Sequence, residues 1–176
     1  TVNRGNKKPY SDQTVCLLLG SNAKFCGPIM VDFANNLPFD MENEYRTSPV
    51  HCITKYYLKQ FKIGQLYEQY GYNIETLHDF DMVQNRPRLL VQTAGHVSGM
   101  AYYYRPQSYG FEQFKYGCSL HPLYGGWFGF RGAFILKDFV CGDFVEKKPI
   151  NVFGGNRDDF EYTLELFDDF DESTFS

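Results

Sequence analysis

Two segments of this chain, residues 92–104 and 117–132, interleave glycines with aromatic side chains inside apolar runs. Glycine lets a backbone approach a neighbour closely, whereas aromatic rings need broad apolar surfaces to pack against. The same segments contain two histidines and one arginine, which are His96, His121 and Arg131. We expect the two segments to enclose one cavity with the guanidinium at its mouth. Such a cavity suits a wide, flat, mostly apolar ligand with polar edges.

The length and composition are those of one soluble globular domain. The chain has 176 residues, of which 43% are hydrophobic and 22% are charged. No apolar run approaches the roughly 20 residues that span a bilayer, and the first residues lack the apolar core of a signal peptide. We therefore predict a single domain over residues 1–176, located in the cytoplasm and without membrane contact.

Acidic and basic residues are unevenly distributed along the chain. The formal net charge is −4, but the acidic C-terminal segment 158–176 carries eight acids and no base. The rest of the chain carries 17 bases against 13 acids, a mildly basic balance that favours anionic ligands. Because these bases form no dense stripe, the sequence argues against nucleic-acid binding.

The five cysteines are odd in number, widely spaced and without a CxxC pair, which argues against a disulfide framework or a zinc ribbon. We expect most of them to be small buried apolar residues. Cys118 and His121 form a single C-x-x-H pair with no second half nearby, so we predict no metal site made of protein ligands alone.

Tyrosine is unusually abundant, with 14 residues beside 17 phenylalanines and one tryptophan. A buried phenol needs a hydrogen-bond partner, so a core uses few tyrosines. Clustered tyrosines are more typical of an apolar wall that meets a ligand or water.

Capping residues and apolar spacing predict three helices. The clearest begins at Ser48, with Pro49 in the first helical position, and ends at Gly71. A short helix is predicted over residues 28–35, whereas the polar segment 37–47 is predicted to be a connection. Asn156 is expected to cap the last helix, whose inward-facing stripe would consist of Phe160, Leu164 and Phe167.

Apolar and aromatic runs predict the strands. These cover residues 15–20 (buried), 72–78, 88–94 (central), 99–105 and 127–136. Arg86-Pro87 is predicted to be a turn, and residues 116–121 are expected to form an antiparallel hairpin with 127–136. Gly129 and Gly132 indicate a bend or a close approach in the last strand. Since strands and helices do not alternate regularly, we expect an α+β fold with a mainly antiparallel sheet flanked by helices.

Two residues outside any standard catalytic motif stand out. His96 begins an H-x-x-G tetrapeptide, a spacing found in some cobalamin-binding proteins, although a lone histidine beside an apolar strand is more often structural. Arg131 lies inside an apolar strand, where an unpaired guanidinium is costly to bury. It either forms an internal salt bridge or clamps a carboxylate or thiolate at an aromatic cavity.

Residues 85–136 resemble the CblC (MMACHC) family of cobalamin-processing proteins. The resemblance rests on the runs RPRLLVQTAGHVSG, AYYY and HPLYGGWFGFRG, and weaker similarity covers nearly the whole chain. It implies a flavin-reductase-like (nitroreductase-like) fold, loss of the alkyl group of alkylcobalamins to glutathione, and reductive decyanation of cyanocobalamin. It also implies electrons from FAD or FMN or from a flavoprotein reductase, a CblD-type adaptor as partner, and a ligand-dependent homodimer.

The resemblance assigns roles to particular residues. Arg131 is similar to an arginine that family members use for glutathione and is the predicted catalytic residue. Arg105 follows three tyrosines at a place where close relatives can have glutamine. The implied cobalamin-binding residues are Leu89, Leu90, Val91, Gln92, His96, Tyr103, Tyr104, Arg105, Ser119 and Phe130.

Two alternatives to an enzyme stay open from the sequence. The chain could be a non-catalytic cobalamin carrier that docks a CblD-type adaptor, or a flavin reductase with no corrin role. Formation of S-methylglutathione separates enzyme from carrier, and the visible spectrum of bound cobalamin tests the flavin reductase.

Overall fold

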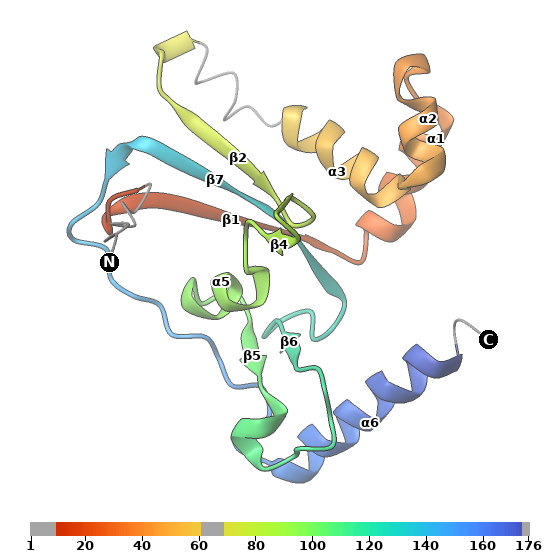
Figure 1. Cartoon of the computed structure of the whole chain (residues 1–176), viewed down its shortest axis with the longest axis vertical. Coiled ribbons are helices and arrows are strands. Elements are labelled where there is room, and N and C mark those ends of the chain that lie inside the picture. The colour runs from red at the N-terminus through yellow and green to blue at the C-terminus, as the bar shows by residue number, and fades with distance from the viewer. Residues whose placement is uncertain (1–9, 61–68, 174–176) are drawn as a thin grey trace, which may run out of the picture. The chain divides into compact units, whose positions relative to one another are not determined.

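The structure is a computed structural model that describes residues 10–60 and 69–173 (Figure 1). The backbone forms two compact units. Unit 1 consists of Thr1–Leu19, Lys24–Leu89 and Arg131–Val145, and unit 2 of Gly20–Ala23, Leu90–Phe130 and Glu146–Ser176. The single domain over residues 1–176 stays a prediction.

Unit 1 is built on a three-stranded sheet of order β1-β7-β2 (Figure 1). Its strands are β1 (Thr14–Asn22), β7 (Phe128–Val140) and β2 (Ile74–His78). Residues 20–22 of β1 and 128–130 of β7 are assigned to unit 2. The three strands confirm those predicted over residues 15–20, 72–78 and 127–136. The expectation that the first is buried was wrong, since Leu17 is 39% exposed and no residue of β1 is buried.

The central strand β7 is buried in its middle and held in antiparallel register by β2. The pairs run from Ile74 opposite Leu136 to His78 opposite Gly132. A side chain added at Gly132 would place its Cβ 2.1 Å from the carbonyl oxygen of Leu77. The close approach predicted from the glycines of this strand is therefore confirmed at Gly132.

The helices of unit 1 gather beside its sheet (Figure 1) and share one core made of Phe25, Phe33, Cys52 and Ile53. They are a π-helical turn at Phe25–Ile29, α1 (Met30–Asn35), a 3₁₀ turn at Phe39–Met41, α2 (Glu42–Thr47) and α3 (Pro49–Gln60).

The predicted helix over residues 28–35 and the start of the helix at Pro49 are confirmed. The Ser48 carbonyl accepts the N–H of Cys52 at 3.0 Å, while residues 61–68 of that predicted helix lie outside the described residues. The connection predicted over residues 37–47 was wrong, because α2 forms there. Its early acids and the i,i+4 pair of Glu42 with Arg46 favour a helix.

A short ribbon joins β3 (Met82–Val83) to β4 (Arg86–Pro87) in antiparallel register. Gln84 and Asn85 form its two-residue turn, with φ angles of 51° and 60°. The prediction of a turn at Arg86-Pro87 was wrong, because these two residues form β4 and the turn lies at the preceding Gln84 and Asn85. Asparagine adopts the left-handed conformation more readily than most residues, which favours the turn at this place.

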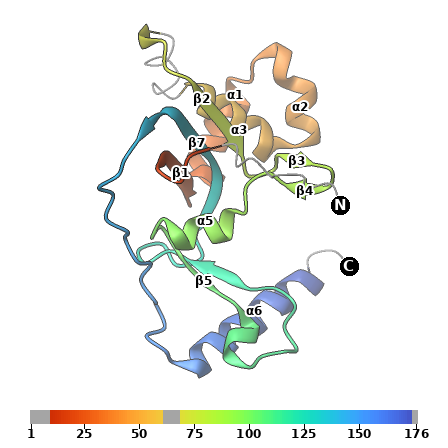
Figure 2. The same cartoon turned by 60° about the vertical axis from the view of Figure 1, so that its left-hand side comes forward.

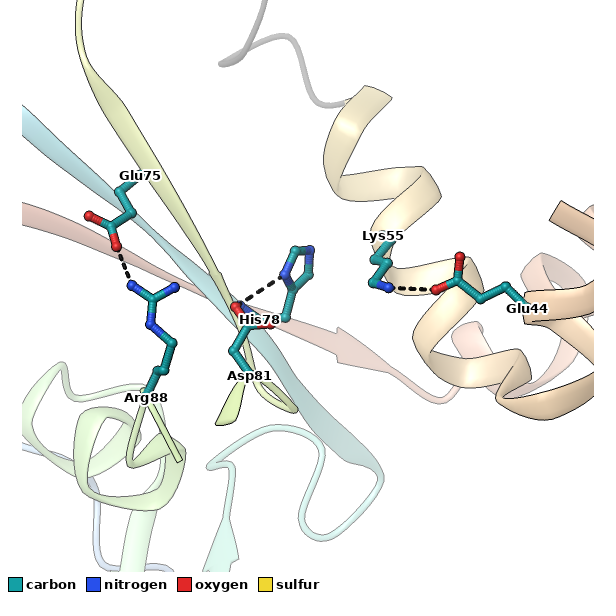
Figure 3. A network of polar contacts seen from close by, with 6 residues as sticks. All are labelled: Glu44, Lys55, Glu75, His78, Asp81 and Arg88. Atoms are coloured by element: carbon teal, nitrogen blue, oxygen red, sulfur yellow. Dashed lines mark hydrogen bonds and ion pairs between the residues drawn. The ribbon is translucent and has the colours of Figure 1, made fainter. Parts of the chain in front are cut away.

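A network of charges on Glu75 ties three segments of unit 1 together. Its carboxylate pairs with Arg88 and with Lys137, the latter at 2.9 Å, and accepts the hydroxyl of Tyr10 at 2.7 Å (Figure 3 draws the pair with Arg88). The hydrogen bonds from Lys137 and Tyr10 and the one from Arg88 lower the pKa of Glu75 to about 2. Figure 3 also shows two separate pairs, His78 with Asp81 and Lys55 with Glu44.

This network makes the stability of unit 1 depend on pH. Since the pKa of Glu75 is depressed, its stabilisation is complete above pH 4.5 and is lost as the pH falls towards 2. We expect Glu75→Gln to lower the free energy of unfolding by roughly 1–2 kcal/mol at pH 7, after allowance for solvent screening of the partly exposed partners. In urea titrations, the difference between wild type and variant should shrink between pH 4.5 and 2. A difference independent of pH would contradict this role.

Unit 2 packs a small antiparallel pair of strands against the C-terminal helix (Figure 2). Its elements are α5 (Val91–Val97), β5 (Tyr102–Tyr104), a 3₁₀ turn at Pro106–Tyr109, β6 (Cys118–Leu120) and α6 (Arg157–Ser173). Its core consists of Tyr104, Phe111, Phe114, Cys118, Leu120, Phe160 and Leu164.

The last helix is confirmed with its predicted cap. The side-chain oxygen of Asn156 accepts the N–H groups of Asp158 and Asp159 at 3.1 and 3.4 Å. Phe160 and Leu164 point into the core, and Phe167 lies outside the residues whose side chains are described.

Two strand predictions in unit 2 were wrong. The segment 88–94 is not a strand, because residues from Val91 onward form α5; a short apolar run fits a buried strand and a helix equally well. Residues 116–121 do not pair with 127–136, because β6 pairs with β5 and β7 pairs with the strands of unit 1. The extended segment predicted over 99–105 is confirmed by β5.

The overall class is nevertheless α+β. Every strand pair whose direction the described residues define is antiparallel: β2 with β7, β3 with β4, and β5 with β6. The narrower flavin-reductase-like arrangement stays a prediction. Most cysteines are not buried as expected, since Cys52 and Cys118 are buried but Cys16, Cys26 and Cys141 are exposed.

Candidate functional site

Unit 2 contains a pocket of about 410 Å³, within the usual range for small-molecule sites. Its lining residues come from α5, from β5 and from the segment after β5 that includes the 3₁₀ turn. They are Thr93, His96, Tyr102, Tyr103, Arg105, Ser108 and Tyr109. Three of them, His96, Tyr103 and Arg105, belong to the predicted cobalamin-binding residues.

His96 is oriented by the strand next to it. Its Nδ1 accepts the backbone N–H of Tyr103 at 3.1 Å, and its ring lies edge-on to that of Tyr102 with centroids 4.9 Å apart. A nitrogen that accepts a hydrogen bond carries no proton, so the geometry assigns the hydrogen of the neutral ring to Nε2. His96 therefore acts as a hydrogen-bond donor in this pocket.

The glycine of the H-x-x-G tetrapeptide ends the helix that carries the histidine. Gly99 has a φ of +75°, and its N–H donates to the carbonyl of His96 at 3.1 Å. A side chain at Gly99 would meet the carbonyl oxygen of Lys147 at 2.4 Å. The spacing of this motif therefore reflects the turn from α5 into β5.

The tyrosines of this unit divide into two groups. Tyr102 and Tyr109 line the pocket, and burial together with the neighbouring phenol of Tyr102 raises the pKa of Tyr109 to about 12. Tyr104 is fully buried, and its hydroxyl donates to Oδ1 of Asn151 at 2.7 Å. Tyr104 thus lies in the core of unit 2, and its contact with cobalamin stays a prediction.

Ser119 and Gln92 lie next to this pocket in the fold. Ser119 is paired with Tyr103 across β5 and β6, so their side chains share one face of the pair. The hydroxyl of Ser119 is buried and has no hydrogen-bond partner among the described residues. Gln92 donates through Nε2 to the carbonyl of Gly117 at 3.3 Å, beside the start of β6.

The remaining predicted residues divide between the units. In unit 2, the ring of Phe130 lies against Gly95, where an added Cβ would meet its Cζ at 2.4 Å, while Leu90 is 63% exposed and Val91 is half-buried. Leu89 belongs to unit 1.

Arg131 also belongs to unit 1, where its guanidinium carbon lies 4.3 Å from the ring centre of Phe25. This distance is that of a cation–π contact between the guanidinium and the ring. The expectation that the two aromatic segments enclose one cavity, with Arg131 at its mouth, stays a prediction.

Four lining residues were not among the residues assigned to cobalamin from the sequence: Thr93 and Tyr102, which lie in the segment 92–104 expected to form the cavity, and Ser108 and Tyr109, which lie beyond it. Thr93 precedes His96 by three residues, and a helical interpretation of this segment would have placed both on one face. Ser108 and Tyr109 reach the pocket through the 3₁₀ turn after Pro106, for which proline at the first position was a visible signal.

The part of the chain that the structure describes contains no cluster of metal-ligating side chains and no membrane-spanning helix. Within residues 10–60 and 69–173, no three His, Cys, Asp or Glu side chains are grouped as a metal site would need. No helix in that part of the chain is long and apolar enough to cross a membrane.

Comparisons with known proteins agree with the resemblance. The model of the MMACHC family, described as the methylmalonic aciduria and homocystinuria type C family, matches residues 1–175. An MMACHC-like protein of Caenorhabditis elegans is 32% identical over 174 residues, which cover 85% of this chain and 61% of the worm protein. A chicken (Gallus gallus) cyanocobalamin reductase / alkylcobalamin dealkylase is 26% identical over 164 residues, covering 90% of this chain and 65% of that protein.

The fold matches as well. The crystal structure of the C. elegans B12-trafficking protein CblC, a human MMACHC homologue, superposes with a TM-score of 0.72 at 31% identity, covering 90% of this chain and 66% of that one. The chain thus spans less than two thirds of the length of each of these relatives. With a family model matched along almost its entire length, the chain belongs to the MMACHC family and has a CblC-like fold.

Proposed function

We propose that this chain binds cobalamin as its substrate, with the lower base displaced from cobalt, and removes the upper axial ligand. The observation that carries the proposal is the pocket of unit 2, whose walls include His96, Tyr103 and Arg105. The support from relatives is the activity that several of them are named for, cyanocobalamin reductase / alkylcobalamin dealkylase.

The pocket suits the rim of a corrin. Tyrosine rings provide apolar faces, and their hydroxyls, together with the Nε2–H of His96, provide donors for the amide groups at the corrin edge. The buried hydroxyl of Ser119 lacks a partner in the described residues, and a bound ligand could supply one. We also propose that cobalamin contacts Leu89, Leu90, Val91, Gln92 and Phe130.

Dealkylation needs no protein nucleophile. The thiolate of glutathione attacks the carbon bound to cobalt, a carbon–sulfur bond forms, and the electron pair of the broken cobalt–carbon bond stays on the metal. Cobalt is reduced by two electrons while the alkyl group leaves as a thioether. A displaced lower base assists, because fewer axial donors make the oxidised metal less stable.

Arg131 is the proposed catalytic residue of this step. A guanidinium binds a carboxylate through two parallel hydrogen bonds, and it stabilises a nearby thiolate. Holding glutathione in this way supplies proximity and orientation. For cyanocobalamin we propose reductive removal of cyanide, with electrons from FAD or FMN in reduced form or from a flavoprotein reductase.

A second candidate is a carrier that delivers cobalamin without changing it. The matched C. elegans structure is described as a B12-trafficking protein, which favours such a role. On this alternative the chain would dock a CblD-type adaptor. For either function we propose that the chain forms a homodimer when its ligand binds.

One experiment separates these functions. The full chain is titrated with methylcobalamin in the dark, followed by glutathione, and S-methylglutathione is measured by mass spectrometry. We expect the cobalamin spectrum to shift to the base-off form and the thioether to appear. Binding without thioether would leave the carrier, and no spectral shift would overturn cobalamin binding altogether.

Arg131→Gln tests the clamp in the same assay. We expect thioether formation at limiting glutathione to fall about tenfold or more, while methylcobalamin affinity changes less than about twofold. Arg86→Gln, an exposed change on β4, is the control. Equal losses of binding and turnover would contradict a role for Arg131 in holding the thiol, and circular dichroism checks that the variant is folded.

A further inference from the structure

Arg105 is the charged residue of the pocket in unit 2. Its guanidinium carbon lies 5.4 Å from the ring centre of Tyr103, so the arginine stacks on one wall of the pocket. The side chain is exposed and forms no ion pair with any described residue. This contact places the guanidinium beside a tyrosine wall of the pocket, and the exposed charge stays open to an anionic ligand.

The other lining groups are hydrogen-bond donors or neutral hydroxyls. His96 presents Nε2–H, because its Nδ1 accepts the N–H of Tyr103. Thr93, Ser108 and the tyrosines add hydroxyl groups. Among the residues that the structure describes, no aspartate or glutamate lines this pocket. The pocket therefore combines one fixed positive charge with several donors and has no negative charge of its own.

We propose that Arg105 binds an oxyanion of the substrates in this pocket. The inference rests on the proposed function and deepens it. Two anionic groups fit the same chemistry: the phosphodiester of the nucleotide tail of cobalamin and a carboxylate of glutathione. Both accept paired hydrogen bonds from a guanidinium.

Substrate pairs that differ only in their anionic groups distinguish the two sources. Cobinamide and cobinamide phosphate share the corrin and differ in the phosphate. Glutathione and its diethyl ester share the thiol and differ in the two carboxylates. Affinity for the corrinoids is read from the visible spectrum, and the dependence of thioether formation on thiol concentration gives KM for each thiol with methylcobalamin.

Arg105→Gln removes the charge and keeps a side chain able to hydrogen-bond. We expect it to weaken the binding of one anionic member, cobinamide phosphate or glutathione, about tenfold, and to change its uncharged counterpart less than about twofold. Arg105→Lys should restore part of the difference. In the wild type, raising the salt concentration should weaken the anionic member selectively, and this dependence should vanish in Arg105→Gln. Arg86→Gln serves as the matched control.

The outcomes of this experiment identify the anion or overturn the proposal. Selective loss for cobinamide phosphate assigns the oxyanion to the nucleotide tail, and selective loss for glutathione assigns it to the thiol. Equal changes for the charged and uncharged members, or no change in either pair, would overturn the proposal while cobalamin binding by the wild type stands. If the wild type binds no corrinoid, the proposed function fails and this proposal fails with it.

Discussion

Gly132→Ala should lower the free energy of unfolding by about 3–5 kcal/mol, the combined cost of a strained backbone and of overpacking. Gly132 has a φ of +144°, a conformation that side chains rarely adopt. Its added Cβ would also lie 2.1 Å from the carbonyl oxygen of Leu77, and backbone in a paired strand cannot move aside locally. Relief therefore requires separating β2 from β7 near His78.

Urea unfolding followed by far-ultraviolet circular dichroism measures this effect. The control is Gly142→Ala, in the same unit, where the added Cβ would meet only Nε2 of Gln13 at an ordinary 3.7 Å. We expect this control to stay within about 0.5 kcal/mol of the wild type. A Gly132→Ala protein as stable as its control would show that the two strands do not approach as closely as described.

Tyr104→Ala should be the second most damaging change, with a loss of about 3–5 kcal/mol. The ring is fully buried, with centroids 4.5 Å from that of Tyr102 and 4.7 Å from that of Phe153. Removing it leaves a cavity in the core of unit 2. Tyr104→Phe keeps the ring and loses only the hydroxyl that donates to Asn151, so we expect about 1–2 kcal/mol.

The same urea titrations test Tyr104, with Tyr116→Ala as the control on an exposed tyrosine of the same unit. If Tyr104→Ala were no more destabilising than Tyr116→Ala, the ring would not belong to the core. Binding to cobalamin is best compared in Tyr104→Phe, because that variant separates a ligand contact from loss of packing.

The sequence predicted elements whose signals are local. Asn156 caps α6 as expected, Pro49 begins α3, and the alternating aromatic run after Trp127 forms β7. In each case the residues that determine the structure lie within a few positions of one another. The capping side chain and the fixed φ of proline are both visible in a short window. The glycines of β7 signalled a close approach, but not that Leu77 is its partner.

Features that depend on distant partners were missed. The run at 88–94 is short and apolar, and its helical form is accompanied by contacts such as that of Gly95 with the ring of Phe130. The partner of β6 is β5 across a loop, which no local pattern specifies. For the same reason, the sequence identified His96, Tyr103 and Arg105 but not Tyr109, which reaches the pocket only through the fold.

The hydrogen bond that orients the ring of His96 bears on whether this histidine can coordinate cobalt. A nitrogen ligand must offer a lone pair, but Nδ1 has committed its own to the backbone of Tyr103, and the opposite nitrogen is protonated. Coordination through Nε2 would require its proton to move to Nδ1. The hydrogen bond from the backbone N–H of Tyr103 to Nδ1 would then be lost. If cobalamin binds in this pocket as proposed, His96 in this tautomer offers it a hydrogen-bond donor rather than a nitrogen ligand.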